Sequence, residues 1–172
     1  MVNFLRLTLA PAAALLLIGC ADAPPETQAE TQSESGPLEG VWSVVAVEQA
    51  GAEPIDPAQP GLYIFAGDHY SAVYTPGPDA RVKSVTSFLP TPEEMVAQYE
   101  SIIVNSGRYE VDGTSLTMRP MIAKSPGFVG GYLRGTFSVT GDTLTLRNEE
   151  LFDRDGVALP DFGEVLTLVR IE

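Results

Sequence analysis

The chain has few of the residues from which catalytic and metal centres are built. Its 172 residues include one cysteine and one histidine, and 10 lysines and arginines stand against 23 aspartates and glutamates, for a formal net charge of −13. A single cysteine excludes a disulfide within the chain, so burial of apolar side chains has to hold the fold together. The acidic excess disfavours nucleic acid and anionic lipid surfaces as partners, because neither is attracted to a negative field.

The most informative residue is the cysteine itself, Cys20. It follows a start containing Arg6 and a short, mostly apolar run, which is too short to span a bilayer and is typical of a secretory signal over residues 1–19. The sequence Leu17-Ile18-Gly19-Cys20 resembles the bacterial lipobox. The resemblance implies cleavage before Cys20 and attachment of acyl chains such as palmitate, which would anchor the protein in a membrane almost irreversibly. The alternative is an ordinary signal peptide with an incidental cysteine.

Residues 20–37 have the composition of a tether. From Ala21 to Pro37 the chain contains four acids, no base and no large apolar side chain. Nothing there offsets the entropy lost on ordering, so we expect this segment to be disordered. Ala21 stands where an aspartate would resemble an inner-membrane retention signal. We therefore expect an exported lipoprotein at the outer membrane, facing the periplasm.

From residue 38 to residue 172, short apolar segments of period two alternate with turn residues, which predicts one all-β domain. Gly67, Gly113 and Gly141 mark tight hairpin turns. Sequential strands of this kind suit a closed, eight-stranded antiparallel up-and-down barrel, which can hold one small ligand. The expected strands cover residues 41–48, 61–66, 70–75, 107–111, 115–121, 132–139, 143–148 and 163–171.

One helix interrupts the strands. Thr91 is a good N-cap, Pro92 suits the first helical position and Glu94 completes a capping box. The pattern predicts a helix from there to about Val104. Its apolar residues recur at helical spacing, so we expect this stripe to lie against the sheet. The stripe consists of Met95, Tyr99, Ile102 and Ile103.

Several motifs together resemble the bacterial lipocalin-like domain. Residues 38–42 (Leu-Glu-Gly-Val-Trp) resemble the opening of the first lipocalin strand, and residues 61–65, 91–94 and 107–112 match its later motifs in order. The resemblance covers residues 38–172. It implies a calycin-type barrel whose floor is closed by Trp42, with Arg170 of the last strand stacked over the indole, and it implies binding of a small molecule. Asn105 and Ser106 depart from the family pattern, which often has an aromatic residue before Gly107.

Strand alternation gives the candidate interior. Residues expected to face inward include Val44, Ala46, Ile64, Ala72 and Leu146. The ligand-binding candidates are side chains that would present a ring, a hydroxyl or a thioether to the cavity. They are Tyr70, Tyr74, Tyr99, Tyr109, Met118 and Phe137.

No catalytic, cofactor or metal constellation is apparent. His69 lies beside a turn and has no second histidine or free cysteine as a partner. Asp153, Asp155 and Glu164 have the spacing of calcium-loop ligands, but Ala158 stands at the sharp-turn glycine, so we interpret the segment as a hairpin loop.

Three functions remain open at this point. The first is a lipid-anchored binder or carrier of a small apolar or aromatic molecule, without a cofactor. The second is a noncatalytic envelope protein with a filled barrel that binds a partner through its surface. The third is an isomerase or cyclase that uses tyrosine and carboxylate side chains in the cavity. The volume of the cavity distinguishes the first function from the second, because a binder needs ligand space that a filled barrel lacks.

Overall fold

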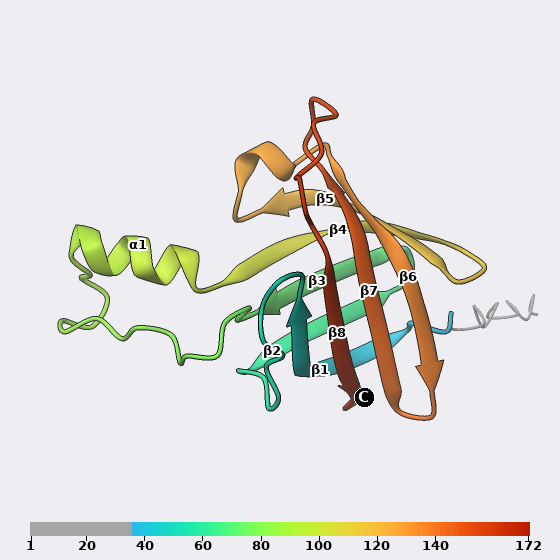
Figure 1. Ribbon diagram of the computed structural model, residues 1–172, viewed down its shortest axis with the longest axis horizontal. Coiled ribbons are helices and arrows are strands. Elements are labelled where there is room, and N and C mark those ends of the chain that lie inside the picture. Colours follow the sequence, from blue (N-terminus) through green and yellow to red (C-terminus); the bar gives the residue numbers. More distant parts are fainter. Residues whose placement is uncertain (1–35) are drawn as a thin grey trace, which may run out of the picture. The chain divides into compact units, whose positions relative to one another are not determined.

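The computed structural model describes residues 36–172. Over these residues the chain forms a closed barrel in which the strands β1 to β8 follow one another in chain order and β8 pairs back onto β1 (Figure 1). The predicted all-β, eight-stranded antiparallel lipocalin-like barrel is confirmed. The predicted signal over residues 1–19, the lipidation site Cys20 and nearly all of the tether over residues 20–37 lie outside the described residues.

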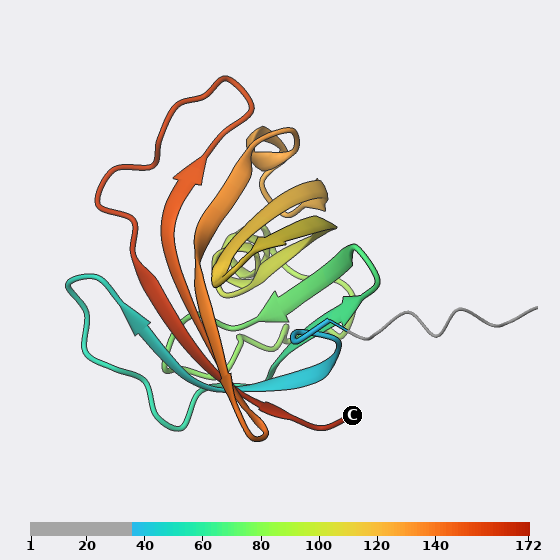
Figure 2. The same cartoon turned by 90° about the vertical axis from the view of Figure 1, so that its right-hand side faces the viewer.

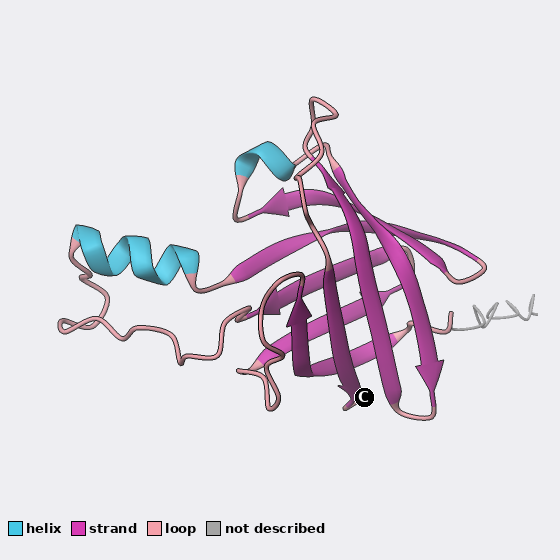
Figure 3. Cartoon of the chain, in the orientation of Figure 1, coloured by secondary structure: helices cyan, strands magenta, loops and turns pink. Residues whose placement is uncertain are grey.

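Figure 3 shows the helices and strands, which follow the predicted order. The largest difference among the strands is β4, which begins at Ile103 and not at the expected Gly107. The strands are β1 (Gly40–Gln49), β2 (Gly61–Ala66), β3 (His69–Tyr74), β4 (Ile103–Asp112), β5 (Ser115–Ala123), β6 (Tyr132–Thr140), β7 (Thr143–Phe152) and β8 (Glu164–Arg170). The helices are α1 (Pro92–Glu100) and the 3-10 turn η1 (Pro126–Phe128). Within residues 36–172, no helix has the length and apolar character needed to cross a membrane.

Glycines make the tight turns and the close strand contacts possible. Gly67, Gly113 and Gly141 have φ values of 60°, 61° and 58°, as the predicted hairpins require. Gly135 lies at a bulge between β6 and β7, and a Cβ there would overlap the carbonyl oxygen of Arg147. Gly135 therefore allows two strands to approach more closely than any other residue would.

The closed end of the barrel is formed around Trp42. Its indole is fully buried, and its Nε1–H donates to the carbonyl oxygen of Leu38 at 2.8 Å. Trp42 and Arg170 are directly paired between β1 and β8, and the guanidinium carbon lies 4.0 Å from the ring centroid. Arg170 also donates to the carbonyl oxygen of Glu39, so one side chain joins the last strand to the residues that precede the first.

Two inward-facing assignments were wrong. A bulge between Val44 and Ala46 shifts the register of β1, so that Val47 is buried at 1% exposure in place of the expected Ala46. In β2, Ile64 is 39% exposed while its neighbours on both sides are buried. This segment is apolar on both faces, and without alternation the sequence does not specify which face is inside.

Helix α1 begins as predicted but does not pack on the sheet. The side chain of Thr91 accepts from the backbone N–H of Glu94, and the Glu94 carboxylate accepts from the N–H of Thr91. The helix ends at Glu100, before the expected Val104, because Ile103 begins β4. None of its residues is buried, and Tyr99 is half exposed. Of the other residues in the predicted stripe, Ile103 belongs to β4 and Ile102 lies between the helix and the strand.

Residues 75–102, which connect β3 to β4 and include α1, form an arm that extends beyond the strands, at the left of Figure 1, and Figure 2 shows α1 nearly end-on behind the barrel. The arm has hydrogen bonds of its own. Gln98 donates to Ser84 Oγ at 2.7 Å, and Arg81 donates to the carbonyl oxygen of Gln98 at 3.2 Å. Polar contacts between helix and loop therefore stabilise α1 in place of an apolar face packed on the barrel.

Candidate functional site

A cavity of about 240 Å³ lies at the open end of the barrel, opposite Trp42. Its base is made of buried side chains from the strands, among them Tyr63, Tyr74 and Glu164. Its rim includes Lys124 and the exposed Leu159 from the β7–β8 loop. Apolar cavities of about 150 Å³ hold a benzene ring, so this one has room for a single ring with a short substituent.

The rest of the barrel interior is filled. Below the cavity, large side chains from most strands are almost completely removed from solvent. Examples are Trp42, Phe65, Met118, Leu144, Leu146, Leu166 and Leu168, each exposed by 1% or less. Within the interior of the described barrel, ligand space is therefore confined to the open end.

The walls of the cavity are mainly apolar. Phe128 of η1, Leu151 of β7 and Phe162 of the β7–β8 loop line it and pack against the core. A pocket with mostly apolar walls and a few fixed polar groups is the usual form of a small-molecule site.

A buried carboxylate lies at the base. Glu164 is 6% exposed, and its Oε2 accepts from the Tyr74 hydroxyl at 2.7 Å and from the Asn148 amide at 3.2 Å. Its Oε1 accepts only a long hydrogen bond, from Gln49 at 3.4 Å. No ion pair in residues 36–172 involves Glu164. The carboxylate is thus held in place by neutral donors and keeps room for another one.

The tyrosines beside Glu164 remain protonated well beyond neutral pH. Burial is the main cause that raises the pKa of Tyr74 well above its ordinary value, and the nearby Tyr63 and Glu164 add to it. Burial also raises the pKa of Tyr63, with Glu164 as the next cause. Tyr74 therefore acts as a hydrogen-bond donor to the carboxylate.

Asn105 contributes a further polar group. It lines the cavity at 8% exposure, and its side chain makes no hydrogen bond within the described part of the chain. The amide still has access to the open space of the cavity, so water or a ligand there can supply its hydrogen bonds. The departure from the family pattern noted at this position thus lies at the cavity itself.

The six ligand-binding candidates are distributed over four environments: the cavity lining, the core, the edge of the core and helix α1. Tyr74 lines the cavity, whereas Tyr70, Met118 and Phe137 lie in the core. Tyr109 is partly buried and packs edge-on against Phe65 at 5.1 Å.

Tyr99 lies on α1, outside the cavity lining. Its hydroxyl donates to the carbonyl oxygen of Lys124 at 3.3 Å, and the Lys124 ammonium lies 4.8 Å from its ring centroid and donates to the carbonyl oxygen of Tyr99 at 3.1 Å. Because Lys124 belongs to the rim, these contacts attach the end of the arm to the edge of the cavity.

Sequence reasoning missed most of the polar base, namely Glu164, Asn148, Asn105 and Tyr63. A signal was present. Glu164 has the same strand parity as Leu166 and Leu168, and Asn148 has the same parity as Leu144 and Leu146. Two polar residues at the same end of inward-facing rows indicate a buried polar site.

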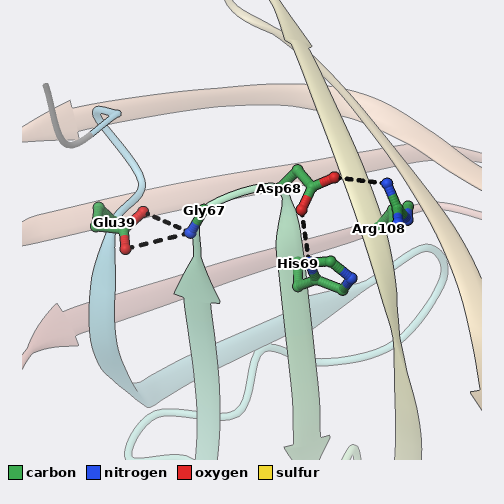
Figure 4. Close-up of polar contacts among 5 residues, drawn as sticks. All are labelled: Glu39, Gly67, Asp68, His69 and Arg108. Atoms are coloured by element: carbon green, nitrogen blue, oxygen red, sulfur yellow. Dashed lines mark hydrogen bonds and ion pairs between the residues drawn. The ribbon is translucent and has the colours of Figure 1, made fainter. Parts of the chain in front are cut away.

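His69 belongs to a separate cluster at the closed end (Figure 4). The carboxylate of Asp68 contacts His69 Nδ1 and lies 2.7 Å from Arg108 Nη1, and all three side chains are more than half exposed. Beside them, the Glu39 carboxylate accepts from the N–H of Gly67 at 3.1 Å. These contacts connect the β2–β3 turn to its neighbours, on the surface and away from the cavity.

The calcium-like spacing belongs to a loop. Asp153 Oδ1 accepts from the backbone N–H groups of Asp155 and Val157 at 2.9 and 2.8 Å, which closes an Asx-type turn, while Glu164 faces the cavity. No group of three or more histidines, cysteines or acids positioned to hold a metal ion occurs among residues 36–172.

The site is therefore defined by its geometry, as a small apolar cavity over a buried Glu164. Comparison of the chain with protein-family models and with curated proteins gives no match.

Proposed function

We propose that this protein is an exported, lipid-anchored binder or carrier of one small apolar or aromatic molecule. The observation that carries the binding proposal is the 240 Å³ cavity, whose walls are apolar and whose base holds the unpartnered Asn105. Such a site gains affinity from burial of a ring and orientation from a few polar contacts. The filled-barrel alternative offers no role for this space.

Binding is tested with benzyl alcohol, a neutral probe of suitable size, by calorimetry and by NMR of the purified protein. We expect one site per chain and shifts confined to cavity residues such as Asn105. Ala123 lines the cavity, so Ala123→Phe should fill it and abolish binding, whereas Ala66→Phe places the same ring on an exposed position. Unchanged binding in Ala123→Phe, or no binding of any small neutral aromatic probe to the wild type, would contradict the proposal.

The anchor is supported by residues 17–20 of the sequence and is tested separately. Cys20→Ser removes the thiol needed for the thioether. In detergent-phase partitioning, the variant should therefore enter the aqueous phase, whereas the wild-type protein should enter the detergent phase. The barrel should keep its melting temperature, because Cys20 precedes residues 36–172. Equal partitioning of both proteins would refute lipidation.

A proton-transfer reaction is a second candidate, favoured by one contact. The 2.7 Å hydrogen bond between Tyr74 and Glu164 joins a donor and an acceptor inside the cavity, as acid–base chemistry requires. Catalysis would exchange solvent deuterium into a molecule that co-purifies with the protein, and Tyr74→Phe would abolish the exchange. A carrier would bind the same molecule without exchange.

A further inference from the structure

We propose that the molecule bound in the cavity carries a protonated amine, which pairs with the carboxylate of Glu164. This inference rests on the proposed binding function and names the class of ligand. The expected ligand has an aromatic or aliphatic body the size of about one ring and a short substituent that carries the positive charge.

The first argument is the missing counter-charge. Glu164 is 6% exposed, yet its hydrogen-bond partners Tyr74, Asn148 and Gln49 are all neutral. Removal of a carboxylate from water costs several kcal/mol of free energy. Hydrogen bonds from neutral donors offset only part of this cost, and a nearby cation offsets more of it. The described chain supplies none within ion-pair distance.

Two basic side chains near this end of the barrel, Lys124 and Arg147, make no ion pair with Glu164. Lys124, on the rim, donates to the carbonyl oxygen of Tyr99 and lies over that ring. Arg147 precedes Asn148 on β7 and is exposed, so its side chain points to the opposite face of the strand from the buried Asn148. The site at Glu164 is thus open to a cation from outside.

The second argument is the distribution of hydrogen bonds on the carboxylate. Oε2 is used by Tyr74 and Asn148 at 2.7 and 3.2 Å, whereas Oε1 has only the 3.4 Å contact with Gln49. A carboxylate oxygen accepts two hydrogen bonds, so Oε1 can receive an N⁺–H group. The two donors on Oε2 hold the carboxylate in one orientation before a ligand arrives.

The third argument is the set of aromatic side chains that line the cavity around Glu164. The same cavity is lined by aromatic side chains of β2, η1 and the β7–β8 loop, namely Tyr63, Phe128 and Phe162. Their rings pack against an apolar ligand body, and ring faces also attract cations. A carboxylate ligand would instead bring a second negative charge beside Glu164, so anions of the same size are excluded by repulsion.

The test compares three probes of nearly equal size, benzylamine, benzyl alcohol and benzoate, on the purified protein at pH 7. We expect benzylamine to bind about tenfold or more tightly than benzyl alcohol, since a charge-assisted hydrogen bond replaces a neutral one. Benzoate should show no binding. Equal affinities for benzylamine and benzyl alcohol would overturn the inference.

Glu164→Gln keeps the shape and removes the charge. It should weaken benzylamine binding by about tenfold or more and change benzyl alcohol binding little. Glu149→Gln is the matched control, because it removes the same charge from the exposed face of β7 and should leave both affinities unchanged. Benzylamine binding that survives in Glu164→Gln would refute the pairing.

A measurement on the wild type keeps the test independent of the variant's folding. The side-chain amide resonances of Asn148, which donates to Glu164 at 3.2 Å, should shift with benzylamine and stay in place with benzoate. If benzyl alcohol binds in the cavity without any preference for the amine, only the ligand class is wrong. If no neutral or cationic probe binds, the proposed function fails with it.

Discussion

The pair formed by Trp42 and Arg170 gives the most direct test of how the barrel is closed. Trp42→Ala removes a fully buried indole and the hydrogen bond from Nε1 to Leu38. A deletion of this kind costs about 3 to 5 kcal/mol of unfolding free energy, since the transferred surface is lost and a cavity remains. That is a large fraction of the stability of a small domain.

Arg170→Ala should cost less. The guanidinium lies 4.0 Å from the ring centroid and is partly buried, so the cation–π contact is worth about 1 to 2 kcal/mol. Its hydrogen bond to the carbonyl oxygen of Glu39 adds about 1 kcal/mol. Loss of the ring contact is common to both single variants, so the double variant should be less destabilised than their sum.

A double-mutant cycle in urea measures this coupling. We expect an interaction energy of about 1 to 2 kcal/mol between Trp42 and Arg170. Arg108→Ala is the control, because its ion pair with Asp68 is exposed and should contribute about 0 to 1 kcal/mol with no coupling to Trp42. If Trp42→Ala does not fold, Trp42→Leu removes the ring face and keeps much of the volume. Strict additivity would refute the reasoning.

Three further predictions concern interior groups. Among residues 36–172, the Tyr70 hydroxyl is the one polar side-chain group that is fully removed from solvent and has no hydrogen-bond partner, so Tyr70→Phe should leave stability unchanged or raise it by about 1 kcal/mol. Tyr74→Phe removes a 2.7 Å hydrogen bond to Glu164 and should cost about 1.5 to 3 kcal/mol in urea unfolding. Burial raises the pKa of Tyr63, Tyr70 and Tyr74, so these groups keep their protons when folded while the unfolded chain loses them above about pH 10. Their stabilising effect is complete below pH 10, and the free energy of unfolding should fall above it by about 1.4 kcal/mol per pH unit for each tyrosine; a flat profile between pH 9 and 11 would contradict this. Gly135→Ala places a Cβ against a backbone carbonyl of β7 and should lower the melting temperature by several degrees. Gly77→Ala is the control and should not, because a Cβ at Gly77 would meet open space.

The barrel was predictable because its signals are local and redundant. Period-two segments, glycine turns and the capping box at Thr91 each specify structure within a few residues, and they agree with one another. The contact between Trp42 and Arg170 was expected because the lipocalin-like resemblance implies it, and the strand parity of the two residues agrees with it. The bulge in β1 was not predictable, since it arises from how two strands pair and has no sequence mark of its own.

The site was harder to predict for a different reason. The sequence predicted that tyrosines would line the cavity. Of the six ligand-binding candidates, Tyr74 alone lines it, and most of the others pack in or against the core. Glu164 was considered only as a member of a calcium-like spacing. Its importance comes from its burial beside Tyr74 and Asn148, which are distant in sequence and meet only when the barrel closes.

The residues that lead into β1 lie at the closed end of the barrel, where Leu38 and Glu39 contact Trp42 and Arg170. The described chain enters β1 at Gly40 beside Arg170, at the Trp42 floor, and the cavity opens at the other end of the same strands. The residues that join β1 to the preceding chain therefore lie at the Trp42 floor and form no part of the cavity lining.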